Sequence, residues 1–398
     1  MYAAGMGQGQ TLNLLLSVGA NPFLYSRPDP SCRSRRTFLH YAIARGHLDL
    51  VLDALGTIRK LYGTEALQVL SQLATLITIF NRRRFTKSGA TFFSKLIKNL
   101  ADVNMTVNDG HKGVQGNNLM HYVLSVEEAL ALVRCGFDQF NSPNSDGKFP
   151  INSLAHHSDP ALVKFCIENG TNVGIKDQEG RTILFDLFSN LQRSVGGRNT
   201  RETLASIRLC LDAGVDIFET DSCICACSPG GCTISSVFSV EFSSALLEFR
   251  PGLLWTLEWV TLVEEHCGVE DARRVLLLLL RRAMCNQYEI DITHTCCHRG
   301  RGIASREQYL YKDRPPLAHE NITDIQNEES EFIDALEDEI EKLASKSLHC
   351  LWSKWMSVIK AKHDAHVKAV NKERAEAKVQ LPRVRVFSTI QIQTTREG

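Results

Sequence analysis

Cysteine and histidine are concentrated in two short segments of this chain, and both residue types can ligate a metal or react with an oxidant. The first segment, residues 221–233, has the spacing C-x-C-x-C-x4-C; the second has a histidine followed by a cysteine pair. The candidate ligands are Cys223, Cys225, Cys227, Cys232, His294, Cys296 and Cys297. Thiolates favour zinc, and structural zinc sites take four Cys or His ligands.

The spacing allows a shared zinc site. In an extended segment, Cys223 and Cys227 point to one face and Cys225 to the other. A bend at Pro229-Gly230-Gly231 brings Cys232 back, and the second segment offers the fourth ligand. The spacing differs from the usual C-x2-C knuckle, so two alternatives stay open: ordinary reduced thiols, and a redox disulfide between Cys296 and Cys297.

Catalysis by these thiols is the weakest interpretation. A cysteine nucleophile needs a positioned base and a third group that orients the base. His294 lies near Cys296 in sequence, but no catalytic signature surrounds the pair. We therefore predict that the protein is not an enzyme, and a thiol or zinc enzyme remains only a third class of function.

The elements that carry the cysteines follow a repeating pattern. Residues 3–21 read AAGMGQGQTLNLLLSVGAN, and Thr37-Phe38-Leu39-His40 begins a second copy. Asn118-Leu119-Met120-His121 is a weaker copy of that start. Gly147 and Gly180 mark two hairpin turns 33 residues apart. Glycines that end helices recur in Gly136-Phe137-Asp138, Gly170-Thr171-Asn172 and Gly214-Val215-Asp216, where a glycine can take the left-handed conformation.

This pattern resembles that of the ankyrin-repeat family, over residues 1–250 in pieces. The resemblance implies an all-α fold: a solenoid of stacked helix pairs with hairpin fingers, followed by a helical C-terminal module. In this register Met1 occupies the place of the signature histidine, so we expect a further repeat upstream. Segments similar to the cysteine insert and to Thr293-His294-Thr295-Cys296-Cys297 occur together in uncharacterised ankyrin proteins of filamentous fungi.

The spacing also shows where the chain departs from the repeat. We expect about six extra residues in the finger before Thr37 and seven in the cysteine finger, residues 221–233. Residues 56–98 form an irregular insert, whose apolar run from Leu67 to Phe80 predicts additional or degenerate helices.

Past residue 250 the repeat pattern fades. Residues 251–298 have the spacing of a helical cap, with Trp255 and Trp259 on one face, and residues 299–326 are a polar linker. A long helix is expected over 327–380, acidic in its first half and basic in its second, followed by a polar tail at 381–398. The apolar stripe of the long helix packs against the body or binds a partner.

Composition narrows the function further. The 45 basic and 45 acidic residues balance, which argues against a dedicated nucleic-acid binder. The sequence has no apolar run long enough for a membrane span. Thirteen cysteines without a secretory signal indicate small buried residues or metal ligands, and an intracellular protein, cytoplasmic or nuclear.

The predicted function is that of a non-enzymatic scaffold that binds a protein partner on the concave surface of the solenoid. The resemblance implies this surface, and Arg33, Arg35 and Arg36, in the lengthened first finger, are its candidate contacts. The alternative is a zinc-stabilised adaptor, associated with nucleic acid, that uses the cysteine finger for recognition. Metal content separates these two hypotheses. The oligomeric state is left open by the sequence.

Overall fold

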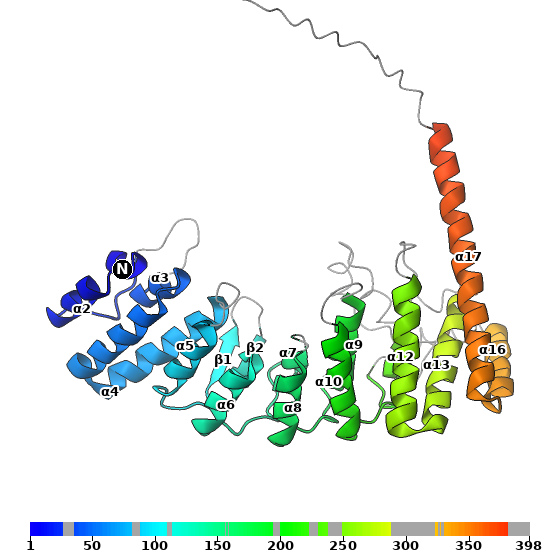
Figure 1. The fold of residues 1–398 in the computed structure, drawn as a ribbon, viewed down its shortest axis with the longest axis horizontal. Coiled ribbons are helices and arrows are strands. Elements are labelled where there is room, and N and C mark those ends of the chain that lie inside the picture. Colours follow the sequence, from blue (N-terminus) through cyan, green and yellow to red (C-terminus); the bar gives the residue numbers. More distant parts are fainter. Residues whose placement is uncertain are drawn as a thin grey trace, which may run out of the picture.

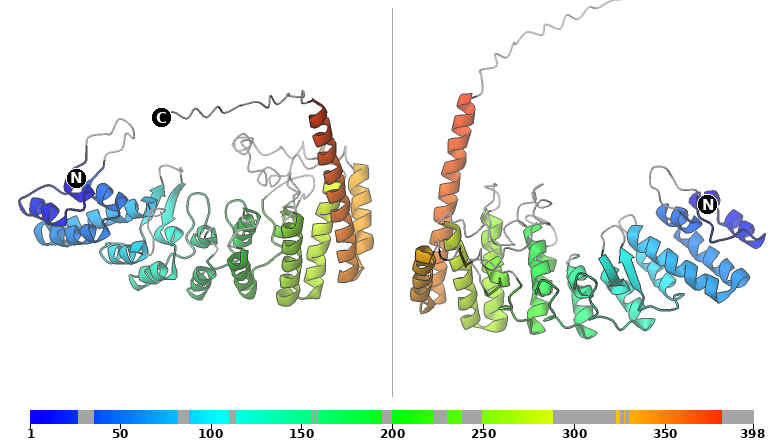
Figure 2. Two further views of the ribbon diagram at one scale, coloured as in Figure 1. Left: turned by 45° about the horizontal axis from the view of Figure 1, so that its top comes forward. Right: turned by 180° about the vertical axis from the view of Figure 1, so that it is seen from behind.

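The computed structural model shows a mostly helical chain whose elements line up along one curved axis (Figures 1 and 2). It describes residues 1–26, 36–81, 88–109, 114–155, 157, 159–193, 200–222, 230–237, 249–287, 323–324, 327 and 330–380. The first helices lie at one end of the array and the C-terminal helices at the other. None of the helices described is long and apolar enough to cross a membrane.

The N-terminal third is built from two helix pairs and one additional helix. Helix α1 (Tyr2–Gly5) packs on α3 (Phe38–Ala44), and α2 (Gly9–Ser17) packs on α4 (Leu48–Asn81). Helix α4 is broken at Gly63, where φ is 85° and ψ is −175°. Only glycine adopts that conformation without strain, so the insert predicted at 56–98 contributes a second helix that ends at Asn81.

Helix α5 (Ser88–Ile97) joins two hydrophobic cores because it is apolar on two faces. Phe92 and Leu96 belong to the core of the first helix pairs, and Phe93 and Ile97 belong to the core of the rest of the chain. All four side chains are buried. The apolar interior is therefore divided at α5, with one face of this helix in each part.

Three helix pairs follow α5. In each pair the first helix is called here the inner helix and the second the outer helix. A two-stranded antiparallel hairpin, β1 (Thr106–Asp109) with β2 (Val114–Asn118), precedes them. The pairs are η2 (Leu119–Tyr122) with α6 (Val126–Arg134), α7 (Pro150–Ala155) with α8 (Pro160–Glu168), and α9 (Ile183–Arg193) with α10 (Thr200–Asp212). Gly136, Gly170 and Gly214 follow the outer helices with φ of 95°, 88° and 81°, which confirms the predicted left-handed caps.

The C-terminal helices close the far end of this array. Helix α11 (Ile234–Val237) leads to α12 (Phe249–Cys267) and α13 (Val269–Gln287). The Trp259 indole is buried, donates from Nε1 to Ser235 Oγ over 3.2 Å and meets the Phe188 ring edge to face at 4.8 Å. Trp255, expected on the same face, lies outside the described side chains. The packing of Trp259 attaches α12 to the last inner helices.

The long helix expected at 327–380 is two helices in the structure, α16 (Ser330–Ala344) and α17 (Leu348–Gln380). The chain turns at Ser345–Ser347, and Ser347 Oγ accepts the Cys350 N–H at 3.3 Å. A serine that caps a helix N-terminus favours a new start over a continued helix. Lys354 Nζ then pairs with Glu339 Oε1 at 2.7 Å across the two helices. Both pack on α13, and α17 extends past the other helices (Figure 1).

Glycines in the fingers provide a test of this packing. A Cβ at Gly180 would lie 2.9 Å from the Ser222 nitrogen, in the next finger, whereas a Cβ at Gly214 would meet nothing within 4 Å; both have positive φ. Gly214→Ala carries only the backbone strain, roughly 1–2 kcal/mol. Gly180→Ala adds a backbone clash, so we expect roughly 1–3 kcal/mol more loss. Urea denaturation of both variants measures the difference, and equal losses would contradict the close approach of the fingers.

Candidate functional site

Four fingers are closed by the same kind of residue pair: an anchor where the finger begins and a base residue where it ends. The anchor donates its N–H to the carbonyl of the base residue, and its side-chain oxygen accepts the N–H of that residue. The pairs are Ser26 with Arg36, Asn144 with Lys148, Asp177 with Arg181, and Asp221 with Cys232. The side-chain bonds measure 3.2, 2.9, 2.9 and 2.9 Å in that order.

Only the number of residues between anchor and base changes. The two are four residues apart in the middle fingers, ten apart in the first and eleven apart in the last. The first and last fingers therefore contain six and seven additional residues, inserted between ends that keep the same geometry. Short side-chain acceptors such as Asn, Asp and Ser suit this turn because they bond a nearby backbone N–H.

The histidine of the repeat start has a structural role in the same region. Nδ1 of His40 accepts the Thr37 N–H, and Nδ1 of His121 accepts the Asn118 N–H, both at 3.1 Å. Burial lowers the pKa of both imidazoles, and for His40 the charge of Arg36 lowers the pKa further. The neutral ring of His121 leaves Nε2–H to donate to the Lys148 carbonyl, at 3.0 Å. His121 thus joins a helix start to the next finger.

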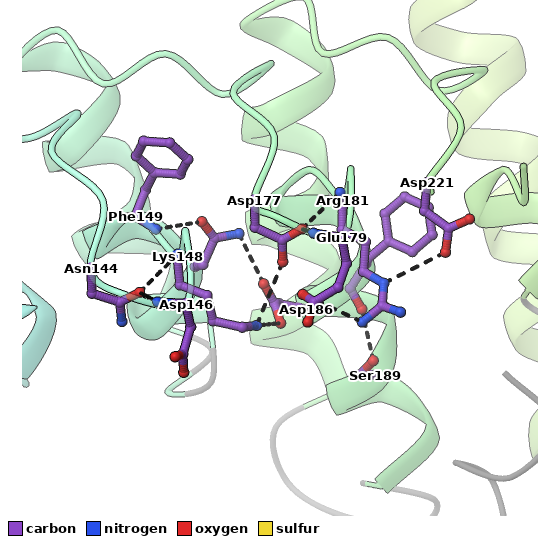
Figure 3. Close-up of polar contacts among 12 residues, drawn as sticks. Asn144, Asp146, Lys148, Phe149, Asp177, Glu179, Arg181, Asp186, Ser189 and Asp221 are labelled. Atoms are coloured by element: carbon purple, nitrogen blue, oxygen red, sulfur yellow. Dashed lines mark hydrogen bonds and ion pairs between the residues drawn. The ribbon is translucent and has the colours of Figure 1, made fainter. Parts of the chain in front are cut away.

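Neighbouring fingers are bonded through their backbones and through a row of side chains (Figure 3). The Ser222 N–H donates to the Glu179 carbonyl at 2.7 Å, and Gln178 Nε2 donates to the Ser145 carbonyl at 2.9 Å. The base residues Lys148 and Arg181 also meet the anchor of the next finger, and Asn117 of β2 meets the anchor Asn144. These contacts, called here the finger ladder, are Asn117–Asn144 at 2.8 Å, Lys148–Asp177 at 3.9 Å and Arg181–Asp221 at 3.6 Å.

Lys148 and Asp186 extend the ladder onto the inner helices. Lys148 Nζ bonds Asp186 Oδ1 at 3.1 Å, and Asn152 Nδ2 bonds Asp186 Oδ2 at 2.9 Å. Asp186 lies on α9 and Asn152 on α7, so the carboxylate links two inner helices to one finger. Figure 3 shows the Lys148 side chain reaching toward Asp177 and Asp186. These bonds hold the Asp186 carboxylate and the Lys148 ammonium group in fixed positions.

Asp177 is the most perturbed acid of the ladder. Its side chain is 1% exposed, and Oδ1 accepts the N–H groups of Glu179 and Arg181. Burial raises the pKa of this carboxyl to about 6, although the bond from Arg181 and the charge of Lys148 act to lower the pKa. At neutral pH the ionised Asp177 carboxylate lowers the stability of the fold. Its burial removes hydration, and Lys148 Nζ, 3.9 Å from Oδ2, compensates only part of that loss.

Most of the residues predicted for metal or partner binding fall outside the described part of the chain. These are Cys223, Cys225, Cys227, His294, Cys296, Cys297, Arg33 and Arg35. Cys232 is buried and takes the base position of the last finger, where its backbone closes the loop on Asp221. Arg36 takes the same position in the first finger. Within the described residues, no group of three or more His, Cys, Asp or Glu side chains could hold a metal.

The sequence interpretation did not identify the ladder. It predicted the turns at Gly147 and Gly180, but it left Lys148, Arg181 and Asp186 unassigned. Equal spacing carries a signal: Lys148 and Arg181 are 33 residues apart, as are Asn144 and Asp177. A repeat alignment would have placed a cation beside the acid of the next finger. Asp186 follows no such spacing, and only its three-dimensional position connects it to Lys148.

Comparisons with known proteins assign no family to this chain. No family model matches it. No curated protein is similar to it in sequence. A chain from the complex of the predatory endopeptidase Bd0816 of Bdellovibrio bacteriovorus with immunity protein Bd3460 is similar in structure, with a TM-score of 0.35 at 18% identity over 51% of this chain and 94% of that one.

The ankyrin-repeat domain of Bcl-3, an IkappaB family member, is also similar in structure. It has a TM-score of 0.31 at 15% identity over 56% of this chain and 88% of that one. Scores this low support no argument about function. The repeat interpretation therefore depends on the internal repetition of finger and helix geometry within this chain.

The raised pKa of Asp177 predicts a dependence of stability on pH. The carboxyl has a pKa of about 6 in the folded chain and near 3.8 in the unfolded chain, so the contribution of Asp177 to stability falls as pH rises between these values. Asn at this position keeps the Oδ1 acceptor, as Asn144 does in the preceding finger. The free energy of unfolding of Asp177→Asn relative to wild type should therefore increase by roughly 2–3 kcal/mol between pH 4 and pH 6.5. A pH-independent difference would contradict this burial.

The zinc hypothesis predicts one zinc per chain in protein purified under reducing conditions without chelator. Elemental analysis measures the metal, and Cys223→Ser and Cys297→Ser should each remove it, because a four-ligand structural site fails when one ligand is lost. Cys350→Ser is the control, since Cys350 is an exposed cysteine on α17, remote in sequence from both cysteine segments. Absence of stoichiometric zinc would reject the site.

Proposed function

We propose that residues 1–250 form divergent ankyrin-type repeats and act as a scaffold, binding a protein partner with the fingers and inner helices. The observation that carries the proposal is the repeated finger closure: four fingers use one pair of backbone and side-chain bonds. Contacts between successive fingers set the middle fingers side by side along one edge of the array (Figure 3). Such a row presents an extended and rigid surface, which suits a protein more than a small molecule.

The exposed side chains at the finger tips determine which kind of partner this surface can bind. Asp146 and Glu179 are exposed on adjacent tips, while the ladder beneath them is buried or half-buried. The Glu179 side chain makes a long contact to Arg181, 3.9 Å from Oε2 to the guanidinium. These two acids are available to a partner without disturbing the fold. We infer a partner that presents basic side chains to the middle fingers.

The first test changes the finger tips. Asp146→Lys with Glu179→Lys should weaken binding of a captured partner by roughly 10-fold or more, because two favourable charge contacts become repulsive. The melting temperature should stay within a few degrees, since exposed side chains contribute little to stability. Partners are captured with the purified full chain as bait, and each is then measured by titration against wild type and variant.

The matched control carries the same charge change on outer helices. Glu168→Lys on α8 and Glu265→Lys on α12 replace two exposed acids away from the fingers. A partner that loses affinity equally for both variants binds by net charge alone, which would contradict the finger surface. In the first finger, reversing Arg33, Arg35 and Arg36 to Glu together should weaken binding with little change in melting temperature.

A further inference from the structure

A cleft lies between helices α4 and α5, which pack side by side in the N-terminal part of the array (Figure 1). Its volume is about 360 Å³, within the roughly 300–1,000 Å³ of small-ligand sites. All residues that line it lie in α4, in α5 or just after α5. The cleft is therefore separate from the fingers that we propose bind a protein partner.

The floor of the cleft is apolar, and one position beside it is open. Leu55 and Leu67 line the cleft and are buried. Gly56 also lines it, within α4, where glycine is less favourable than alanine. A Cβ on Gly56 would meet no atom within 4 Å, and Gly56 is not among the glycines with positive φ. Neither packing nor backbone strain requires glycine here, whereas a ligand in the cleft would use the space that a side chain would fill.

The walls of the cleft carry two acids and two bases. Asp49, Asp53 and Arg59 line it from α4, and Lys95 lines it from α5. All four residues are exposed, and within the described part of the chain none of them forms an ion pair. Asp49 and Asp53 are four residues apart on one face of the helix, where like charges repel each other. The four charges are therefore available to a ligand.

The order of the charges along α4 determines which kind of ligand fits. At 1.5 Å per residue, Asp53 and Arg59 are roughly 9 Å apart along the helix axis. A ligand with charges of one sign would meet repulsion as well as attraction in this cleft. A ligand with an ammonium group at one end and a carboxylate at the other can pair with both residues. An extended tripeptide separates these two groups by roughly 10 Å, at about 3.3–3.6 Å per residue.

We propose that the cleft between α4 and α5 binds a short zwitterionic peptide, about three residues long, with free ends. Asp49 and Asp53 hold its ammonium group, Arg59 and Lys95 hold its carboxylate, and its backbone lies over Gly56. A guanidinium suits a carboxylate because it can donate two parallel hydrogen bonds. The leucine floor contacts the side chains of the peptide without a polar group to select them, so the site recognises the chain ends.

Titration calorimetry of the full chain with trialanine tests this site. We expect a dissociation constant of roughly 0.1–1 mM, which suits a ligand of this size. N-acetyl-trialanine and trialanine amide each lack one terminal charge, so each should bind about 10-fold more weakly or worse. A segment inside a longer protein has neither charge. Equal binding of the blocked and the free peptides would therefore overturn the recognition of chain ends.

Substitutions separate the cleft from general surface charge. Arg59→Gln should weaken trialanine binding about 10-fold or more, because the carboxylate loses its guanidinium partner. The matched control is Lys60→Gln, which removes the neighbouring exposed base on α4 that does not line the cleft and should leave binding unchanged. Gly56→Leu should abolish binding by filling the open space. Its melting temperature should equal or exceed that of wild type, since leucine favours a helix more than glycine does.

Three further results would overturn the proposal. They are absence of binding at roughly 10 mM trialanine, equal losses from Arg59→Gln and Lys60→Gln, and a folded Gly56→Leu variant that binds as wild type does. Arg59→Gln with its control still decides the question if Gly56→Leu fails to fold. The finger variant Asp146→Lys with Glu179→Lys should bind trialanine normally, so this proposal and the proposed function fail independently.

Discussion

Closure of each finger by its anchor and base residues is the constraint on which the rest of this structure depends. A tight turn leaves backbone N–H groups without helix or sheet partners, and a short side chain within the turn accepts the hydrogen bonds that these groups need to donate. Asn144, Asp177, Asp221 and Ser26 all perform this role, although they differ in charge and size. Because the closing residues hold the two ends together, six or seven further residues leave the closing bonds of a finger unchanged. The cysteine-rich insert therefore occupies a position where added residues cost little.

The contacts between fingers combine close backbone packing with paired polar and charged side chains. Gly147 and Gly180 allow the next finger's backbone to approach at distances that a Cβ would prevent. The side-chain ladder above them changes from a neutral pair, Asn117–Asn144, to the ion pairs Lys148–Asp177 and Arg181–Asp221. Since the neutral pair supports the same geometry, charge is not required for stacking. Burial raises the pKa of Asp177 to about 6, which shows that the charged version has an electrostatic cost.

The two ends of the array are completed in different ways. At the C-terminal end, Trp259 fills the space beside Phe188, and α13 is covered by α16 and α17. Arg281 reaches Glu337 and Lys354 reaches Glu339, so charged pairs surround the apolar contacts between these helices. At the N-terminal end, α1 and α2 leave apolar side chains exposed and carry no charge. Stacked helix pairs need their terminal faces covered or polar. At the C-terminal end, α16 and α17 provide this cover for α13.

The sequence by itself determined the features that follow from local chemistry. Glycines at fixed spacing predicted the left-handed caps at Gly136, Gly170 and Gly214, because few other residues adopt that backbone without strain. The spacing of Asp and Gly predicted the turns, and the apolar run at 67–80 predicted a helix in the insert. It also predicted one long helix at 327–380, where the structure has two. There the capping bond of Ser347 and the pairing of Lys354 with Glu339 favour two helices joined by a turn. Helix propensity alone predicts neither contact.

Only the tertiary structure decided how neighbouring fingers and helix pairs meet. The partner of Lys148 lies 29 residues away at Asp177 or 38 residues away at Asp186, and packing of one finger and its helices on the next creates both contacts. The burial that raises the pKa of Asp177 arises in the same way, since the lost hydration depends on the neighbouring fingers. Exposure of an apolar side chain is likewise a tertiary property: Leu14 and Leu16 are both leucines of one helix, yet one is exposed and the other buried, because only one of them faces α4 and the core.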